Sequence, residues 1–464
     1  MTSEYLKFGS SLFGTDGVRG LANVYPMTPE IALALGQAVA HLFGGHRDSA
    51  RSIVIGKDTR LSGYMFEDAL AAGMCSMGSN VIQTGPIPTP GLAFLTRDLR
   101  CDAGVMISAS HNIYQDNGIK FFARDGFKLR DNLEIKMEES IRNRTFESYR
   151  VSSEKIGRAK RIEDAAGRYG VFLKEKFPID MTLRGLRVVL DCANGAAYKV
   201  GPTVLSELGA DLITLGTRPD GRNINENCGS TDVRALSEAV RSSGADIGIA
   251  LDGDADRCLL VSEKGDLIDG DEMLSMFAED MSKRKVLKTP LVVATTMSNL
   301  GLEKYLQGLG VSLARTGVGD RYVVEEMRSK GTNLGGEQSG HIIFLDQNTT
   351  GDGLLTALQA LAITIRSGRT LSELVSKFQR FPQVLVNLDV TERKPFAELG
   401  KFSEELRKIE GELAKTGRII VRYSGTELKA RIMIEGEDQA TIDKFADSLA
   451  SLLHVELGSS SVDN

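Results

Sequence analysis

The sequence predicts an α/β protein with three similar α/β domains, built on mixed sheets, and a smaller C-terminal α+β domain around a central cleft. Three observations predict this fold. A strand–helix–strand pattern occurs three times at one internal spacing, each copy leads to a strand that ends in a polar loop, and the pattern changes after about Phe378. At 464 residues, the chain is also too long for a single hydrophobic core.

Each of the three repeats contains two glycines seven residues apart, with an apolar stretch between them. The first glycine stands where it would end a helix, and the stretch after it is expected to form a strand. A short apolar run upstream is typical of a strand buried on both faces. The glycine pairs are Gly78 and Gly85, Gly209 and Gly216, and Gly310 and Gly317, and the upstream runs begin at Ile53, Val188 and Leu291. The repeats therefore predict three β-α-β units.

A second strand follows each repeat and ends in a chemically distinct polar loop. The three segments are GVMISASHN at 104–112, IGIALDGDADR at 247–257 and NLGGEQSGH at 333–341. In open α/β sheets, ligands bind where the carboxyl ends of strands meet loops. We therefore expect the three domains to contribute one loop each to a shared cleft.

The last part of the chain has a different pattern. Residues 384–390 alternate like a half-buried strand, 402–414 form a charged helical segment, and a second strand is expected from Ile419. We expect connectors near 155–169 and 282–289. The predicted domains are 1–165, 166–269, 270–378 and 379–464.

Composition excludes several classes of protein. The net charge of −6 is spread along the chain without a basic block, which argues against nucleic acid or an anionic membrane as the main partner. The first residues do not resemble a signal peptide, and the longest apolar stretch, 354–365, is too short to span a bilayer. Five scattered cysteines indicate reduced thiols in the cytoplasm rather than disulfides or a zinc site. Any metal should therefore have oxygen ligands.

The loop DGDADR places carboxylates at Asp252, Asp254 and Asp256, directly after a strand. Such a set can surround one hard divalent cation such as Mg²⁺. An EF-hand is excluded because Arg257 takes the position where the sharp turn requires glycine, and both flanks read as strands. The remaining alternative is a solvated acidic turn, in which three close carboxylates would repel one another.

Ser110 follows an apolar strand within the segment Ser108–Asn112. A serine hydroxyl is a weak nucleophile without a base or a metal, and the hydrolase pattern GxSxG is absent from the chain. A serine that carries a phosphoryl group against the cation of the acidic loop fits better, because phosphoryl transfer depends on positioning and charge neutralisation. The alternative for Ser110 and His111 is a capped polar turn.

Three further segments carry groups suited to a phosphorylated polar ligand. In GGEQSGH, Glu337 and Ser339 can grip hydroxyls or an amine, and His341 can exchange a proton. RYSGTE starts at Arg422, and FGTDGVRG places a second arginine, Arg19, between glycines. Convergent donors and positive charge are what a phosphate monoester requires. The alternatives are a glycine-rich turn with a satisfied histidine for GGEQSGH and a polar hairpin turn for RYSGTE.

Together and in this order, FGTDGVRG, ISASHN…DNGIK, DGDADR, GGEQSGH and RYSGTE resemble the α-D-phosphohexomutases, over about residues 10–435. The resemblance implies three related α/β domains and a different fourth domain. It also implies an isomerase that moves a phosphoryl group within a hexose phosphate. Gln338, LDCANGAAY at 190–198 and NINENCGSTD at 223–232 resemble the branch that interconverts glucosamine 6-phosphate and glucosamine 1-phosphate. This is a cytoplasmic step toward UDP-N-acetylglucosamine and the bacterial cell wall.

The resemblance also implies roles for individual residues and small molecules. One Mg²⁺, an amino-sugar phosphate substrate and a hexose 1,6-bisphosphate activator are expected, and a homodimer is left open. The roles are a phosphorylated Ser110, with catalytic help from Arg19, His111, Lys120 and His341; metal binding by Ser110, Asp252, Asp254 and Asp256; sugar binding by Arg257, Glu337 and Ser339; and binding of the unreacting phosphate by Arg422, Ser424, Gly425, Thr426 and Arg431.

Two positions depart from the family pattern. Ile113 and Leu428 stand where the family usually has proline, which removes a fixed φ from two functional loops. Other functions stay open: a phosphomannomutase or phosphoglucomutase, a silent sugar-phosphate sensor, and a metal-dependent phosphatase. For the phosphatase, Ala255 and Asp256 do not supply the expected D-x-D-x-T/V start.

Overall fold

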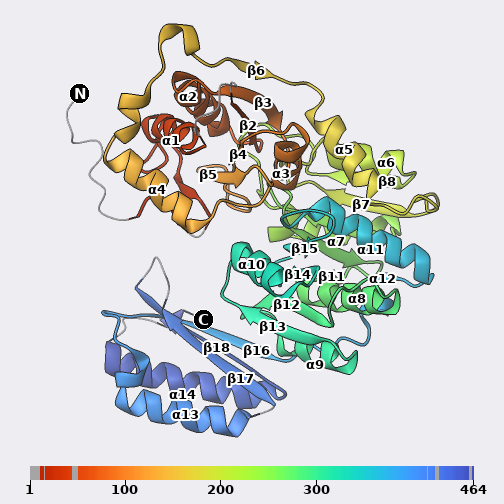
Figure 1. The fold of residues 1–464 in the computed structure, drawn as a ribbon. Helices are drawn as coiled ribbons and strands as arrows, with labels where there is room; N and C mark the ends of the chain where they lie inside the picture. Colours follow the sequence, from red (N-terminus) through yellow and green to blue (C-terminus); the bar gives the residue numbers. More distant parts are fainter. Residues whose placement is uncertain are drawn as a thin grey trace. The chain divides into compact units, whose positions relative to one another are not determined.

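The computed structural model describes residues 11–14, 16–43, 51–414, 416–423, 428–458 and 462–463 (Figure 1). The chain divides into two compact units. One contains residues up to 297 and 309–376, and the other contains 298–308 and the chain from 377 onward. Each unit is described by itself.

The first sheet of the larger unit has six strands in the order β1-β5-β4-β2-β3-β6. Its strands are β1 (Val18–Leu21), β2 (Ser52–Lys57), β3 (Asn80–Pro86), β4 (Ala103–Ile107), β5 (Asp116–Ala123) and β6 (Ala159–Arg161). The helices of this region are α1 (Pro29–Leu42), α2 (Ser62–Ser76), α3 (Thr89–Asp98) and α4 (Asp131–Arg142). Leu35, Phe66 and Phe121 belong to the core between α1, α2 and the sheet.

The second and third sheets of this unit repeat part of that topology. The second has the order β11-β10-β9-β7-β8, and the third has the order β13-β12-β14-β15. Their strands are β7 (Arg187–Asp191), β8 (Asp211–Leu215), β9 (Ile247–Leu251), β10 (Cys258–Ser262), β11 (Leu267–Ile268), β12 (Leu291–Thr295), β13 (Ser312–Thr316), β14 (Leu334–Gly336) and β15 (Ile342–Phe344). The helices are α5 (Ala165–Glu175), α6 (Val200–Glu207), α7 (Arg234–Ser243), α8 (Gly270–Lys283), α10 (Asp320–Lys330), α11 (Gly353–Ser367) and α12 (Leu371–Val375).

The three sheets share one order of four strands: β5-β4-β2-β3, β10-β9-β7-β8 and β15-β14-β12-β13. In each, the first pair is antiparallel and the other two pairs are parallel, so all three sheets are mixed. The predicted α/β class and threefold repeat are therefore confirmed. Gly78, Gly209 and Gly310 all have positive φ (82°, 99° and 72°), the backbone conformation that suits glycine after a helix.

The shared topology places the three polar loops at one equivalent position. Each loop joins the two antiparallel strands of its sheet: β4 to β5, β9 to β10, and β14 to β15. Each antiparallel pair carries its loop at the carboxyl end of a strand that also pairs with a parallel neighbour.

The two segments expected as connectors also contain regular structure. The segment 155–169 contains β6 and the start of α5, where Tyr169 is fully buried and donates a hydrogen bond to Asp352 Oδ1 at 2.8 Å. The charged residues around Arg161 hid a short edge strand, because such strands tolerate charge on both faces. The second expected connector, 282–289, begins inside α8.

The C-terminal unit contains a four-stranded sheet in the order β17-β18-β16-β19. Its elements are α9 (Leu300–Gly308), β16 (Gln383–Asp389), α13 (Gly400–Leu413), β17 (Gly417–Tyr423), β18 (Lys429–Gly436), α14 (Gln439–Leu457) and β19 (Val462–Asp463). Figure 1 shows α13 and α14 lying against one face of this sheet. Phe402, Ile432 and Leu449 are in the core between them. Strands followed by covering helices confirm the predicted α+β character.

Among the described helices, none combines the length and apolar content that crossing a bilayer requires.

Candidate active site

Ser110 lies in the loop after β4, and its backbone has the left-handed value φ = 53°. The side chain is almost fully buried, and its Oγ donates a hydrogen bond to Asp252 Oδ2 at 2.6 Å. His111 Nδ1 lies 3.4 Å from the same Oγ. Two residues that are 142 positions apart are thus in direct contact, where the sequence analysis expects a cation between them.

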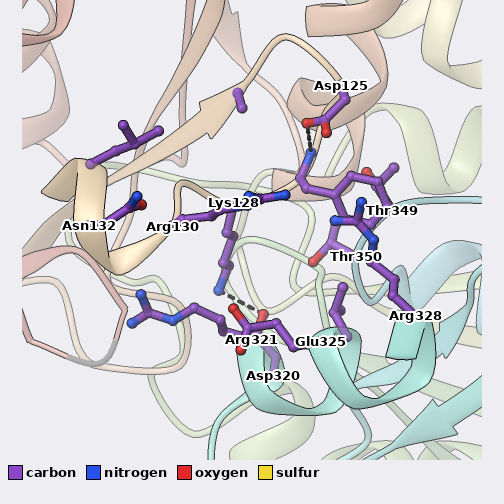
Figure 2. Close-up of a pocket in the computed structure, with 14 residues that line it drawn as sticks. Asp125, Lys128, Arg130, Asn132, Asp320, Arg321, Glu325, Arg328, Thr349 and Thr350 are labelled. Atoms are coloured by element: carbon purple, nitrogen blue, oxygen red, sulfur yellow. Dashed lines mark hydrogen bonds and ion pairs between the residues drawn. The ribbon is translucent and has the colours of Figure 1, made fainter. Parts of the chain in front are cut away.

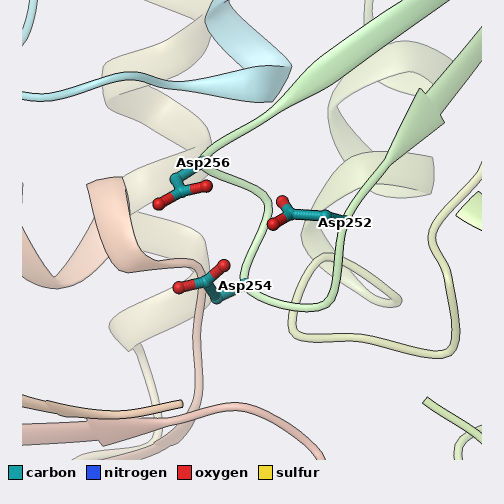
Figure 3. A group of neighbouring side chains, drawn as sticks. All are labelled: Asp252, Asp254 and Asp256. Carbon is teal, nitrogen blue, oxygen red and sulfur yellow. The ribbon is translucent and has the colours of Figure 1, made fainter. Parts of the chain in front are cut away.

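Asp252, Asp254 and Asp256 lie in the hairpin connection between β9 and β10, and all three are buried (Figure 3). One oxygen from each carboxylate lies within 4.8 Å of the others. Gly253 allows this loop to touch the serine loop: a Cβ built there would lie 2.6 Å from the carbonyl oxygen of Ser110. The close approach of the two backbones therefore requires glycine at this position.

The acidic loop fits a hard divalent cation. Asp254 Oδ1 and Asp256 Oδ1 are buried and accept no hydrogen bond from any described residue. Burial, together with repulsion from the other two carboxylates, raises the pKa of Asp252 well above its usual value. Carboxylate oxygens that converge on one point are the donor set that Mg²⁺ binds.

Lys120, on β5, is buried with its Nζ 3.1 Å from Asp254 Oδ2 and 3.9 Å from Asp256 Oδ2. Burial alone would lower its pKa, but Asp16 and the two carboxylates of the acidic loop outweigh burial and raise the pKa. Asp16 Oδ2 is 3.1 Å from Lys120 Nζ and also accepts a hydrogen bond from Arg19 at 3.2 Å. Asp16 thus connects Arg19 to Lys120, and Lys120 connects both to the acidic loop.

His341, at the start of β15, lies between two carboxylates. Nδ1 is 3.6 Å from Asp256 Oδ1, and Nε2 is 3.4 Å from Asp320 Oδ2. The backbone N–H of Gly351 donates a hydrogen bond to Nε2 at 3.1 Å. Burial opposes the charged imidazole, but the adjacent Asp256 and then Asp320 raise the pKa of His341 to about 9. Two opposing demands therefore act on Nε2: Asp320 favours a proton there, whereas the Gly351 amide favours a lone pair.

His111 has the opposite environment. Burial, and after it the positive charges of Arg257 and Arg19, lower the pKa of His111 to about 4. Its imidazole is therefore neutral at pH 7. Arg257 follows the acidic loop, with its Nε 4.0 Å from Asp256 Oδ1.

Lys128 joins the two sides of the site. Its Nζ pairs with Asp16 Oδ1 at 2.5 Å and with Asp320 Oδ2 at 2.7 Å. It also lines a cavity of about 670 Å³ between the segment that links β5 to α4 and helix α10. Figure 2 shows Lys128 and Asp320 facing each other at the wall of this cavity, with Arg130, Arg321 and Arg328 around it.

Glu337 and Ser339 occupy the third polar loop, between β14 and β15. Glu337 is half-buried and accepts a hydrogen bond from the backbone N–H of Gly319 at 3.1 Å. Ser339 is exposed, and its hydroxyl donates to Glu337 Oε2 at 3.4 Å. The two groups present one acceptor and one donor on the same loop, which suits the hydroxyls or amine of a sugar.

In the C-terminal unit, Arg422 on β17 lies directly opposite Arg431 on β18. Two guanidinium groups at paired positions of neighbouring strands are close enough to bind one phosphate group together. Ser424, Gly425 and Thr426 lie outside the described residues.

The structure thus brings together most of the predicted residues of the larger unit. Ser110, His111, Lys120, His341 and the acidic loop form one connected group, and Arg19 joins it through Asp16. Sequence reasoning missed Asp16, Thr89, Lys128 and Asp320. Asp16 lies inside the motif FGTDGVRG, which was a usable signal, whereas Thr89, which donates to Asp254 Oδ2 at 2.6 Å, stands in no motif.

Comparison with protein families gives four matches that together cover most of the chain. All four are domains of one family, described as phosphoglucomutase/phosphomannomutase. Domain I matches residues 10–148, domain II matches 168–265, domain III matches 269–381, and the C-terminal domain matches 385–452.

Curated relatives named phosphoglucosamine mutase are similar over nearly the whole length. The relative from Geobacter metallireducens is 56% identical and the match covers 96% of this chain and 99% of that protein. The relative from Myxococcus xanthus is 55% identical, with 98% and 99% covered. The relative from Syntrophotalea carbinolica is 54% identical, with 96% and 98% covered.

Solved structures show the same fold at low identity. A phosphoglucomutase/phosphomannomutase family protein from Burkholderia thailandensis aligns with a TM-score of 0.80 at 22% identity, covering 97% of this chain and 99% of that one. N-acetylphosphoglucosamine mutase from Aspergillus fumigatus, in complex with GlcNAc-6P and magnesium, aligns with a TM-score of 0.64 at 18% identity, covering 96% and 95%.

Proposed function

The chain belongs to the phosphoglucomutase/phosphomannomutase family, and from this premise we propose that it is an isomerase that interconverts glucosamine 6-phosphate and glucosamine 1-phosphate. The observation that carries the proposal is the 2.6 Å contact between Ser110 Oγ and Asp252 Oδ2, beside two further buried carboxylates. It supports a serine that carries a phosphoryl group next to a divalent cation.

The proposed reaction has two phosphoryl transfers. In the first, the phosphorus–oxygen bond at Ser110 breaks, a sugar hydroxyl oxygen bonds to phosphorus, the hydroxyl proton passes to a base, and Ser110 Oγ takes up a proton. The product is a bisphosphorylated sugar. After the sugar reverses, Ser110 Oγ gives up its proton and bonds to the other phosphorus, the bond from that phosphorus to the sugar oxygen breaks, and the freed sugar oxygen takes up a proton. A hexose 1,6-bisphosphate accordingly serves as activator, because it can phosphorylate a free Ser110.

Each residue role follows from its contacts. Mg²⁺, held by Asp252, Asp254, Asp256 and the seryl phosphate, would neutralise charge on the transferring group. Lys120 and Arg19, joined through Asp16, provide positive charge beside Ser110. Lys120 and His341 are the candidates for proton transfer. His111 touches Ser110 Oγ, and its neutral imidazole suits it to orient the serine.

We assign the binding of the sugar, and of the phosphate that is not reacting, to other segments. Arg257, Glu337 and Ser339 would bind the sugar, since they combine a cation, an acceptor and a donor near the third loop. Arg422 and Arg431 would hold the phosphate that is not reacting, and their opposed register supports an anion between them. Ser424, Gly425 and Thr426 would complete that site with hydroxyls and backbone N–H groups.

The cytoplasm is the proposed location. All five cysteines are free, which is typical of a reducing compartment, and a product used to build UDP-N-acetylglucosamine for peptidoglycan is needed there.

The first test is the mass of the purified protein. We expect a fraction heavier by about 80 Da, the mass of one phosphoryl group, that increases on incubation with hexose 1,6-bisphosphate and is absent in Ser110→Ala. Ser110→Ala should also abolish mutase activity. A wild-type enzyme that is active with no trace of the heavier species, before or after incubation with bisphosphate, would contradict the phosphoserine.

The second test ranks substrates. We expect kcat/KM to be highest for glucosamine 1-phosphate among the glucosamine, mannose and glucose 1-phosphates. A higher value for mannose or glucose would identify a phosphomannomutase or phosphoglucomutase. Stoichiometric release of inorganic phosphate would identify a phosphatase, and tight binding of sugar phosphate with no turnover would identify a sensor.

A further inference from the structure

The loop 108–115, which carries Ser110 and is called the serine loop below, is held by one arginine that lies outside the motifs of the sequence analysis. Arg60 lies between β2 and α2, and its side chain is fully buried. Its two terminal nitrogens donate hydrogen bonds to four backbone carbonyl oxygens of the loop: Ser110 at 3.0 Å, Asn112 at 2.7 Å, Asp116 at 3.1 Å, and Ile113. One guanidinium group thus binds carbonyl oxygens at three positions of the loop between β4 and β5 and at the first residue of β5.

A second set of bonds fixes the direction of this arginine. Arg60 Nε pairs with Asp58 Oδ2 at 2.8 Å, and the hydroxyl of Ser108 donates to the same oxygen at 2.7 Å. The backbone N–H of Ser110 donates to Ser108 Oγ at 2.9 Å. Arg60 is therefore bonded directly to the carbonyl oxygen of Ser110 and is linked through Asp58 and Ser108 to the backbone N–H of Ser110.

The same short segment also contacts the region that carries the acidic loop. Thr59 Oγ1 donates to the carbonyl oxygen of Asn194 at 2.5 Å, and the backbone N–H of Leu61 donates to that of Gly221 at 2.9 Å. From that region, Asn225 Nδ2 donates to the carbonyl oxygens of Ser110 and Asn112, at 2.8 and 2.9 Å. The carbonyl oxygens of Ser110 and Asn112 thus accept hydrogen bonds both from Arg60 and from Asn225.

The loop needs this external support. Ser110 has φ = 53°, a left-handed conformation that is unfavourable for a residue other than glycine. Position 113 is isoleucine, half-exposed, so no proline ring restricts the backbone there. An arginine supplies five donors in a rigid planar fork, which lysine cannot reproduce.

We propose that Arg60 is a positioning residue for phosphoryl transfer, which sets the place of Ser110 relative to Asp252 and supplies the loop rigidity that isoleucine at 113 does not. Its effect on turnover rests on the proposed function, but its effect on the loop does not. The side chain of Arg60 contacts Asp58 and backbone carbonyl oxygens rather than the side chains assigned to the sugar or the metal, so its loss should change kcat and leave KM nearly constant.

The test uses Arg60→Lys in the full-length chain, which keeps the charge beside Asp58. We expect kcat to fall about 10- to 100-fold with KM within about threefold, because an error of 1 Å in placing a reacting group costs about that much. Hydrogen–deuterium exchange should become faster in a peptide spanning 108–118, in which the amides of Asn112 and Asp116 are hydrogen-bonded. This readout is valid even for an inactive protein, so failure of the proposed function is distinguishable.

Two further variants separate positioning from general stability. Arg418 is a mostly buried arginine in the C-terminal unit that pairs with Glu435 and donates to the carbonyl oxygen of Ser298. Arg418→Lys should lower the melting temperature but leave exchange in 108–118 unchanged. Ile113→Pro removes no backbone hydrogen bond that the described structure contains. When it is added to Arg60→Lys, it should restore exchange protection in 108–118 and raise kcat at least tenfold.

Two outcomes would overturn the proposal. One is wild-type exchange in 108–118 together with wild-type kcat in Arg60→Lys. The other is a proline that is tolerated in the wild-type background yet restores neither exchange protection nor kcat in Arg60→Lys. If Arg60→Lys does not fold by itself, the same comparison is made between Arg60→Lys with Ile113→Pro and Ile113→Pro alone.

Discussion

The serine loop and the acidic loop occupy the same place in two copies of one repeat, yet they are held in opposite ways. Each contains a non-glycine residue with φ = 53°, Ser110 in one and Ala255 in the other. The serine loop is uncharged in its unphosphorylated form and is held by side chains from elsewhere, Arg60 and Asn225. The acidic loop concentrates negative charge that the described side chains do not fully neutralise.

This difference teaches how one scaffold position acquires two tasks. A loop that binds a cation must leave carboxylate oxygens without donors, because donors would compete with the ion. A loop that carries a phosphoryl group must keep its hydroxyl in place through many catalytic cycles, so its backbone is saturated with donors. Asp352 provides a third case: it is fully buried, but Tyr169, Asn348 and the Leu355 amide all donate to it. Burial of a carboxylate by itself therefore does not mark a metal site.

The largest effect is expected from Asp254→Asn, which removes one charge from the acidic loop. We expect kcat to fall about 10²- to 10³-fold, because charge neutralisation at the transferring group is lost. Mg²⁺ should raise the melting temperature of the wild-type protein by mass action, and this rise should shrink in the variant. Asp352→Asn is the matched control and should keep the Mg²⁺-dependent rise. An equal rise in melting temperature for wild type and Asp254→Asn would show that Asp254 does not bind the metal.

The next effect is expected from Gly253→Ala, which separates the two loops. The new Cβ would lie 2.6 Å from the carbonyl oxygen of Ser110, so one backbone must move. We expect kcat to fall about 10- to 100-fold, since Ser110 is displaced from Asp252. Gly167→Ala on α5 is the control, because nothing lies within 4 Å of a Cβ built there. Unchanged kcat in Gly253→Ala would show that the contact between the loops can relax without cost.

A smaller effect is expected from Lys128→Met, which leaves both loops intact. Lys128 joins Asp16 to Asp320, and through them Lys120 to His341. We expect kcat to fall about tenfold, in the range seen when outer partners of a site are removed, with Lys128→Arg intermediate. The measurement is steady-state kinetics at saturating Mg²⁺. Wild-type kcat in Lys128→Met would show that Lys120 and His341 act independently.

The smallest effect is a pH dependence of stability that comes from Asp352. Burial raises the pKa of Asp352 to about 6 in the folded protein, above its value of 3.8 in the unfolded chain. The folded protein therefore holds this proton more tightly, so its contribution to stability is greatest below about pH 4 and is lost as pH rises through 6. The free energy of unfolding should fall by no more than about 3 kcal/mol over this range, relative to Asp352→Asn. Denaturant titrations of both proteins measure this difference, and parallel curves would contradict the raised pKa.

Much of the fold was predictable because it depends on local patterns. The glycine pairs and apolar runs predict the three repeats, since strand burial and helix ends are determined by neighbouring residues. Strand β6 within the charged stretch around Arg161 was not predictable, because a short edge strand has no apolar signature of its own. The acidic loop was predictable for the same local reason: Asp252, Asp254 and Asp256 stand at alternate positions of one turn.

The sequence by itself determined the repeated strand–helix units, the polar loops that follow them and the types of chemical group that these loops carry. Only the tertiary structure decided which of these groups meet. The contact of Ser110 with Asp252, the grip of Arg60 on the serine loop and the position of Lys128 between Asp16 and Asp320 join residues far apart in the chain. Such contacts depend on how sheets and loops pack in three dimensions, and the spacing of residues along the chain does not show which of them will meet.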